Sequence, residues 1–151
     1  MIIIGYPGIG KTTLSGRGLG YIDLESGCFN FGGEKIENWH KVYVKLAKYL
    51  SRQGYRVFVS SHDEVREALR SYDDVYIIYP SLDLKDEWVE RLRKRYDESE
   101  KEKDRRAWLN AEHNYEKQIK ELMNEDTFKH IVIDNMHYRL SSMIWENKRS
   151  R

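Results

Sequence analysis

The chain has 151 residues, and its 26 basic and 25 acidic residues leave a formal net charge of +1. This balance excludes a general electrostatic field for nucleic acid or for an anionic membrane surface, so any anion site must be local. The single cysteine, Cys28, excludes an internal disulfide and a cysteine-rich zinc site, and it fits a reducing compartment.

The length predicts one domain over residues 1–151, which is enough chain to bury one hydrophobic core. Residues 1–4 are too few for the apolar part of a signal peptide, and no long apolar run follows them. We therefore expect a cytoplasmic protein with no membrane partner.

The first twelve residues carry the most specific pattern in the chain. Three isoleucines predict a short buried strand and lead into a run that fits the P-loop pattern of Gly, four residues, Gly, Lys and Thr. Glycines in this run allow backbone conformations that a Cβ would block, so that successive N–H groups can point at phosphate oxygens. The run is Gly5-Tyr6-Pro7-Gly8-Ile9-Gly10-Lys11-Thr12, and Thr13 follows it in the predicted nucleotide-binding set.

Two side chains of this run have predicted roles toward a bound nucleotide. We expect Lys11 to reach the β- and γ-phosphates as a cation, and Thr12 to bind a Mg²⁺ that bridges them. The helix that Lys11 begins would turn its positive dipole end toward the same anion. Glycine-rich turns also occur by chance, but a strand before and a helix after are the context that favours phosphate binding.

The rest of the chain alternates short apolar runs with helical patterns. Helices are expected where apolar residues recur three and four positions apart, and strands where β-branched residues form short runs. Five such strands separated by helices indicate an α/β fold, with a parallel sheet covered on both faces and ligands at the carboxyl ends of its strands. After residues 1–4, strands are predicted at 21–25, 56–60, 75–79 and 130–134, and helices at 11–17, 37–53, 63–71, 81–96, 107–122 and about 140–144.

On this loop and this order of elements, the chain resembles the P-loop nucleoside and nucleotide kinase superfamily. Its small size is similar to that of nucleotide-kinase-like proteins encoded by bacteriophages, which would place it in the host cytoplasm. Only the loop is highly specific, although the order of elements matches over most of the chain. The resemblance implies a three-layer P-loop fold with strand order 2-3-1-4-5, an acceptor-binding insert at about 26–54, and a lid at about 97–106 that closes over ATP.

A group of arginines carries a second resemblance. The run Arg91-Leu92-Arg93-Lys94-Arg95 resembles the R-L-x-x-R at the lid entrance of adenylate kinases. By that match Arg91 would stack on the base of ATP and Arg95 would bind phosphates, while Arg105 and Arg106 would supply charge to the transferring group. A planar guanidinium can both stack and bind phosphate oxygens. The alternative is a solvated charged helix with pairs such as Glu87 with Arg91.

Asp23 and Glu25 are the predicted carboxylates of the acceptor side. Both fall on one face of the second predicted strand, at its carboxyl edge. For a hydroxyl acceptor, one of them could take the proton. For a nucleoside monophosphate no base is needed, and Asp23 could instead hold Mg²⁺ through water. An acid after a strand can also simply cap the next turn.

The third predicted strand ends in Ser60-Ser61-His62, with Arg66 one turn later. Adenylate kinases carry Asp-Gly-Phe-Pro-Arg at the matching place, and this sequence lacks that motif, which argues against AMP in particular. We predict that Arg66 binds the acceptor phosphate. His62 is placed in the same substrate site, with capping or packing as an equal alternative.

Together these features predict a nucleotide kinase that uses ATP and Mg²⁺, takes a (deoxy)nucleoside monophosphate as acceptor, and exists as a monomer or homodimer. One alternative is a hydroxyl-directed kinase of nucleosides or polynucleotide 5′ ends with Asp23 or Glu25 as base, although the near-zero net charge argues against a nucleic acid partner. Another is a nucleotide-binding regulatory ATPase, which would need a Walker B acid where Ser60-Ser61 stand. The predicted catalytic residues are Lys11, Asp23, Arg95, Arg105 and Arg106.

Overall fold

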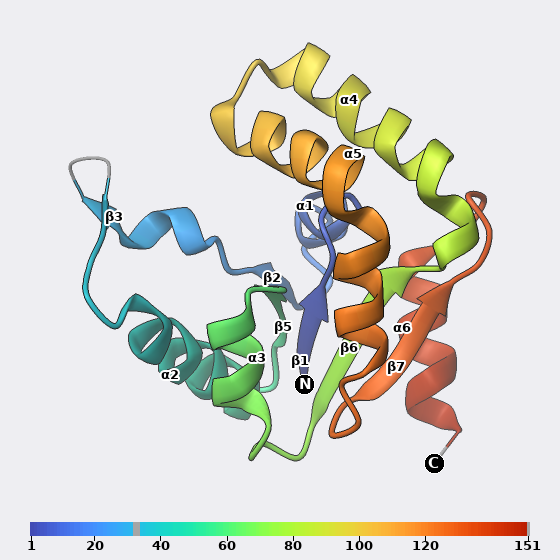
Figure 1. The fold of residues 1–151 in the computed structure, drawn as a ribbon. Helices are drawn as coiled ribbons and strands as arrows, with labels where there is room; N and C mark the ends of the chain where they lie inside the picture. The colour runs from blue at the N-terminus through green and yellow to red at the C-terminus, as the bar shows by residue number, and fades with distance from the viewer. Residues whose placement is uncertain (32–33, 151) are drawn as a thin grey trace. The chain divides into compact units, whose positions relative to one another are not determined.

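The structure, a computed structural model, describes residues 1–31 and 34–150, with side chains described outside 28–35. Five parallel strands form one sheet in the order β2-β5-β1-β6-β7, flanked by helices (Figure 1). The predicted α/β fold and its strand order 2-3-1-4-5 are therefore confirmed. The strands of this sheet are β1 (Ile2–Gly5), β2 (Tyr21–Asp23), β5 (Arg56–Ser60), β6 (Val75–Pro80) and β7 (Lys129–Ile133).

The helices follow the predicted apolar spacing. A short antiparallel ribbon of β3 (Asn30–Phe31) and β4 (Glu34–Lys35) lies inside the segment expected to bind the acceptor. The described helices are α1 (Lys11–Ser15), α2 (Trp39–Arg52), α3 (Asp63–Leu69), α4 (Lys85–Ser99), α5 (Glu102–Met123) and α6 (Leu140–Arg149), with 3-10 turns η1 (Ser26–Phe29) and η2 (Leu82–Leu84).

The chain divides into two compact units, and each is described by itself. The first comprises Met1–Gly5, Gly10–Ile77 and Thr127–Lys129. The second comprises Tyr6–Ile9, Ile78–Asp126 and His130–Arg151. The glycine-rich loop therefore has its first and last residues in the first unit and its centre in the second.

In the first unit, β1 lies in parallel register with β5, and β5 with β2. Ile3 pairs with Phe58, and both side chains are completely buried. Such continuous apolar runs are expected of strands that are covered on both faces. Helix α2 packs against α3 and β5 through its buried residues Tyr43, Val44 and Ala47.

In the second unit, α4 and α5 form a helical hairpin and lie side by side (Figure 1). Trp88 and Leu92 of α4 are buried, as are Tyr115 and Ile119, which lie four residues apart on α5 within the helix predicted at 107–122. This hairpin brings Arg95 of α4 and Asp104 of α5 together near its tip, where the predicted lid lies.

Several predicted boundaries differ from the structure. Helix α4 continues to Ser99 and α5 begins at Glu102, so most of the polar segment 97–106 is helical. The two helices are joined near this turn by an ion pair, in which the buried Asp104 of α5 binds Arg95 of α4. Strand β2 ends at Asp23, so the prediction that Glu25 shares this strand is wrong.

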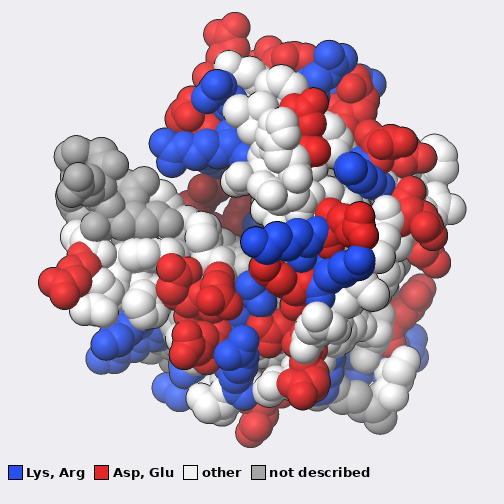
Figure 2. Space-filling model, in the orientation of Figure 1, with Lys and Arg blue, Asp and Glu red and all other residues white. Residues whose placement is uncertain are grey.

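None of the helices in the described part of the chain combines the length and the apolar character needed to cross a membrane. The sequence contained no long apolar run, and the structure agrees with it on this point. The polar faces of α4 and α5 carry many of the charged residues of the second unit, and blue and red side chains alternate there in Figure 2.

Candidate functional site

The glycine-rich loop lies between β1 and α1, in the context that the sequence predicted. Gly8 and Gly10 have φ values of 89° and 105°, which side chains with a Cβ rarely adopt. A Cβ on Gly8 would also lie 3.0 Å from Leu92 Cδ2 and 3.2 Å from Trp88 Nε1. Both glycines are therefore required by the shape of the loop.

The loop buries the side chains of Tyr6 and Ile9 inside the protein. Tyr6 is buried, donates its hydroxyl to Gln118 Oε1 at 2.8 Å and packs edge-on against Tyr115. Ile9 is only 1% exposed. Of the predicted nucleotide-binding residues in the centre of the loop, these two can therefore offer a ligand only their backbone groups.

In the first unit, two predicted site residues are brought together. The hydroxyl of Thr12 donates to Asp23 Oδ2 at 2.9 Å, which joins the start of α1 to the end of β2. Lys11 donates from Nζ to the carbonyl of Gly5 at 3.1 Å, so its ammonium lies back over the loop. Thr13 follows on α1 with an exposed side chain.

In the second unit, three side chains donate to consecutive carbonyl oxygens of the loop. Trp88 Nε1 lies 2.9 Å from Pro7 O, Arg91 Nη1 lies 3.2 Å from Gly8 O, and Tyr138 Oη lies 2.7 Å from Ile9 O. Two of these residues, Trp88 and Tyr138, are absent from the predicted site. Trp88 could have been suspected from its place one helical turn before Arg91, whereas nothing in the sequence marks Tyr138.

Arg91 has aromatic neighbours within the protein itself. Its guanidinium carbon lies 4.7 Å from the centre of the Trp88 ring and 5.3 Å from that of Tyr138, and Nη1 donates to Tyr138 Oη at 2.7 Å. Burial raises the pKa of Tyr138, while the Arg91 charge acts in the opposite direction. Its hydroxyl therefore keeps a proton to donate to the loop.

The other predicted arginines are held at the tip of the hairpin. Arg95 Nε lies 3.0 Å from Asp104 Oδ1, and Ser99 donates to Asp104 Oδ2 at 2.6 Å. Arg105 and Arg106 both pair with Glu102, at 3.5 and 3.4 Å. In the part of the chain that the structure describes, none of the three has a hydrogen bond or ion pair to residues 6–9.

On the acceptor side, the buried Tyr43 joins the ends of β2 and β5. Its hydroxyl donates to Leu24 O at 2.6 Å and accepts from the N–H of Ser60 at 2.9 Å. Burial raises the pKa of Tyr43 to about 12; the Ser60 hydrogen bond lowers it, and the charges of Asp23 and Glu25 raise it. The two predicted carboxylates thus lie near one buried hydroxyl.

His62 lies in the same region as these groups. Its Nδ1 is 2.7 Å from Ser60 Oγ, and its ring meets the half-buried Trp39 edge-on at 5.5 Å. Trp39, which the sequence analysis did not place in a site, also contacts the ring of Tyr43. These residues form an aromatic wall at the carboxyl ends of two strands, where ligands bind in open parallel sheets.

Arg66, the predicted ligand of the acceptor phosphate, already has protein partners. Its side chain is only 8% exposed and lies 3.5 Å from Asp63, and Nε donates to Ser61 O at 3.1 Å. An acceptor phosphate would have to join or replace these contacts.

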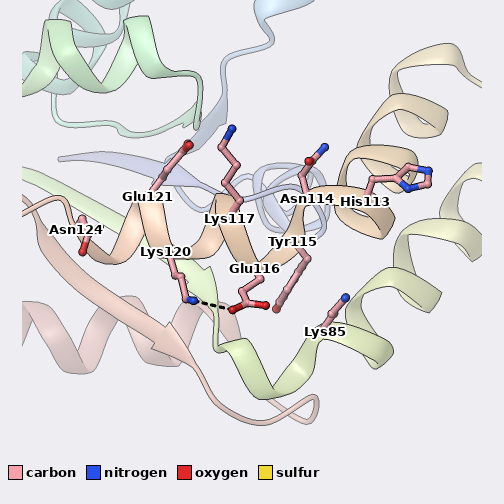
Figure 3. A pocket seen from close by; sticks show the side chains of 9 residues that line it. All are labelled: Lys85, His113, Asn114, Tyr115, Glu116, Lys117, Lys120, Glu121 and Asn124. Atoms are coloured by element: carbon pink, nitrogen blue, oxygen red, sulfur yellow. Dashed lines mark hydrogen bonds and ion pairs between the residues drawn. The ribbon is translucent and has the colours of Figure 1, made fainter.

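A pocket of about 540 Å³ lies along α5, with Lys85 of α4 at its edge (Figure 3). Figure 3 shows Lys117 and Glu121 extending to one side of α5 and Glu116 and Lys120 to the other. Lys120 and Glu116 pair with each other at 2.6 Å. This pocket contains none of the predicted site residues, and its charges do not converge on one point.

Comparisons with known proteins add no family to these findings. No protein-family model matches the chain, and no curated protein matches it. The candidate residues are therefore defined within each unit. In the second unit they are the centre of the glycine-rich loop and the three donors to its carbonyls, and in the first unit they are the Thr12–Asp23 contact and the wall around Tyr43.

Proposed function

We propose that the protein is an ATP-dependent phosphotransferase that moves the γ-phosphoryl group of ATP to a (deoxy)nucleoside monophosphate. The observation that carries this proposal is the glycine-rich loop between β1 and α1, at whose end Thr12 hydrogen-bonds Asp23. A carboxylate beside the hydroxyl that follows the loop lysine is the arrangement expected where phosphates and a divalent cation bind together.

Lys11 and the Thr12–Asp23 pair fit ATP and Mg²⁺ chemically. Hydroxyl and carboxylate oxygens are ligands that Mg²⁺ accepts, so Thr12 would hold the ion and Asp23 would support it. When bound, Mg²⁺ supplies positive charge to the phosphates. Lys11 already lies over the loop and would add its charge there, binding the phosphates and stabilising the transferring group.

The rest of the chemistry in this proposal is positioning. The wall of Trp39, His62 and Tyr43 would orient the acceptor and exclude water from it. Arg95 could bind phosphates only if its ion pair with Asp104 opens or is shared. The side chains of Arg105 and Arg106 are 48% and 74% exposed, so a phosphate could recruit them at little desolvation cost.

The first test is Lys11→Ala, measured as ADP release with a panel of nucleoside monophosphates. Loss of one electrostatic contact to the transition state typically lowers kcat about 100- to 1000-fold, and we expect a loss of that size. Lys45→Ala on the exposed face of α2 is the matched control and should keep full activity. Activity of Lys11→Ala equal to that of the wild type, with an unchanged circular dichroism spectrum, would remove the proposal.

A hydroxyl-directed kinase is the second candidate, and the burial of Arg66 favours it. A guanidinium already held by Ser61 O and Asp63 is less available to an acceptor phosphate. Asp23 or Glu25 would then take the proton of the hydroxyl, a role typically worth about 100- to 10,000-fold in rate.

Two substitutions separate these candidates. For a monophosphate acceptor, Glu25→Gln keeps substantial turnover, and Arg66→Ala raises the acceptor KM by the loss of a contact worth about 1.5–3 kcal/mol. For a hydroxyl acceptor, a carboxylate substitution abolishes turnover and Arg66→Ala is silent. Nucleosides and 5′-hydroxyl oligonucleotides complete the panel, and thermal unfolding of each variant checks that it is folded.

A further inference from the structure

The three donors that meet the loop carbonyls come from two separate places in the second unit. Trp88 and Arg91 lie one turn apart on α4, and Tyr138 lies between β7 and α6. Trp88, Arg91 and Tyr138 donate in order to the carbonyl oxygens of Pro7, Gly8 and Ile9, and the Tyr138 hydroxyl also lies 3.5 Å from Gly8 O.

These contacts determine where the N–H groups of the loop point. A trans peptide is planar, and its C=O and N–H bonds point in opposite directions. The carbonyls of Pro7, Gly8 and Ile9 point toward the three donors. The N–H groups of the same peptides, which belong to Gly8, Ile9 and Gly10, therefore point away from the donors. Successive N–H groups on one side of a loop form an anion-binding concavity.

We propose that Trp88, Arg91 and Tyr138 form a carbonyl clamp, a set of positioning residues that orients the loop N–H groups for a polyphosphate. This inference rests on the proposed nucleotide site and deepens it, because it assigns Arg91 to the loop backbone and not to the base of ATP. The ligand class that the clamp prepares for is a polyphosphate, whatever base it carries.

Packing alone does not account for this arrangement. Trp88 is completely buried, and its indole N–H points at Pro7 O, a direction that burial of the ring does not by itself require. Arg91 Nη1 binds Gly8 O and also Tyr138 Oη, so two members of the clamp fix each other. Trp88 and Tyr138 are stacked at 6.1 Å with an interplanar angle of 24°. The three side chains thus hold one another in place through contacts within the protein itself, which is what preorganised binding requires.

The test compares Tyr138→Phe and Arg91→Met with the wild type in calorimetric titrations of Mg·ATP and of Mg·tripolyphosphate, which has no base. Loss of one hydrogen bond typically lowers affinity about 2- to 10-fold, and more where the donor is charged. We expect both ligands to lose affinity by the same factor in each variant. A base-stacking Arg91 would instead weaken ATP and leave tripolyphosphate unchanged, which would overturn the clamp.

Tyr115→Phe is the matched control, because it also removes a tyrosine hydroxyl from a backbone carbonyl, that of Ser81, in the same unit. It should lower thermal stability to a similar extent and leave both affinities unchanged. If Tyr115→Phe lost as much affinity as the clamp variants, their loss would reflect lower stability of the fold and not the orientation of the loop, and the clamp would be overturned.

A second measurement needs no ligand. Amide exchange of Gly8, Ile9 and Gly10 in the ligand-free protein should be faster in Tyr138→Phe than in the wild type, and unchanged exchange contradicts the clamp. If the wild type binds neither ligand, the proposed function fails, and the clamp fails with it. If the wild type binds both and the variants bind equally well, only the clamp fails.

Discussion

Single tyrosine hydroxyls connect backbone groups that no regular secondary structure joins. Tyr43 links the ends of two strands, Tyr138 holds the loop, and Tyr115 holds the carbonyl of Ser81. A buried tyrosine contributes packing through its ring and a hydrogen bond through its hydroxyl, so substitution by Phe separates the two contributions.

The Tyr43 hydroxyl predicts a specific dependence of stability on pH. Its folded pKa of about 12 lies above the unfolded value near 10, so its contribution is complete below pH 10 and is lost as the pH rises through 12. In this window the unfolded chain releases the proton first, and stability falls by about 1.4 kcal/mol per pH unit. The stability gap between the wild type and Tyr43→Phe should therefore be constant to about pH 10 and shrink above it.

Urea unfolding at a series of pH values from 8 to about 11.5 measures this gap. A Tyr43→Phe gap that stays constant above pH 10 would contradict the assigned pKa.

At the scale of secondary structure, the α4–α5 hairpin is the element whose character the sequence predicted least well. A run of polar residues at 97–106 was expected to separate the two helices, but only residues 100 and 101 lie outside them. Glu100 turns the chain with a left-handed φ of 55°. The Arg95–Asp104 contact, which joins residues of the two helices, is invisible to a local pattern.

The lid prediction can be tested directly on this hairpin. Most side chains at the tip are exposed, so its backbone amides should exchange quickly with solvent. A bound nucleotide that contacts the arginines of the tip should slow this exchange. We expect a non-hydrolysable ATP analogue together with an acceptor to slow amide exchange at 97–106 more than in β1, β5 and β6. Equal protection of the tip with and without ligands would show that it is not a lid.

The fold itself follows from patterns that a sequence displays openly. Buried parallel strands need continuous apolar runs, and the predicted strand at 56–60 has the bounds of β5. Thr12 and Asp23, which the sequence analysis assigned to one Mg²⁺, are likewise joined by a hydrogen bond. Local pattern cannot show which side chains reach a backbone carbonyl from a distant element, and for that reason Trp88, Tyr138 and the contact of Arg91 with Gly8 O were missed.

For the whole molecule, the proposed function predicts stabilisation by ligand. Binding to the folded state at a free concentration of 100 times Kd adds about 2.7 kcal/mol. For a chain of this length, each kcal/mol raises Tm by roughly 2–4 °C, so Mg·ATP should raise it by about 5–11 °C. Differential scanning calorimetry measures the shift. Lys11→Ala should lose most of it, and an equal shift in this variant would place the nucleotide elsewhere.

Trp88 also gives the protein an optical property. Its indole is completely buried and hydrogen-bonded to Pro7 O, whereas Trp145 is 53% exposed. With the other three tryptophans replaced by phenylalanine, the emission of Trp88 would come from a ring in direct contact with the loop backbone. The fluorescence of this one residue would then follow the loop in real time, without a label and without a coupled enzyme.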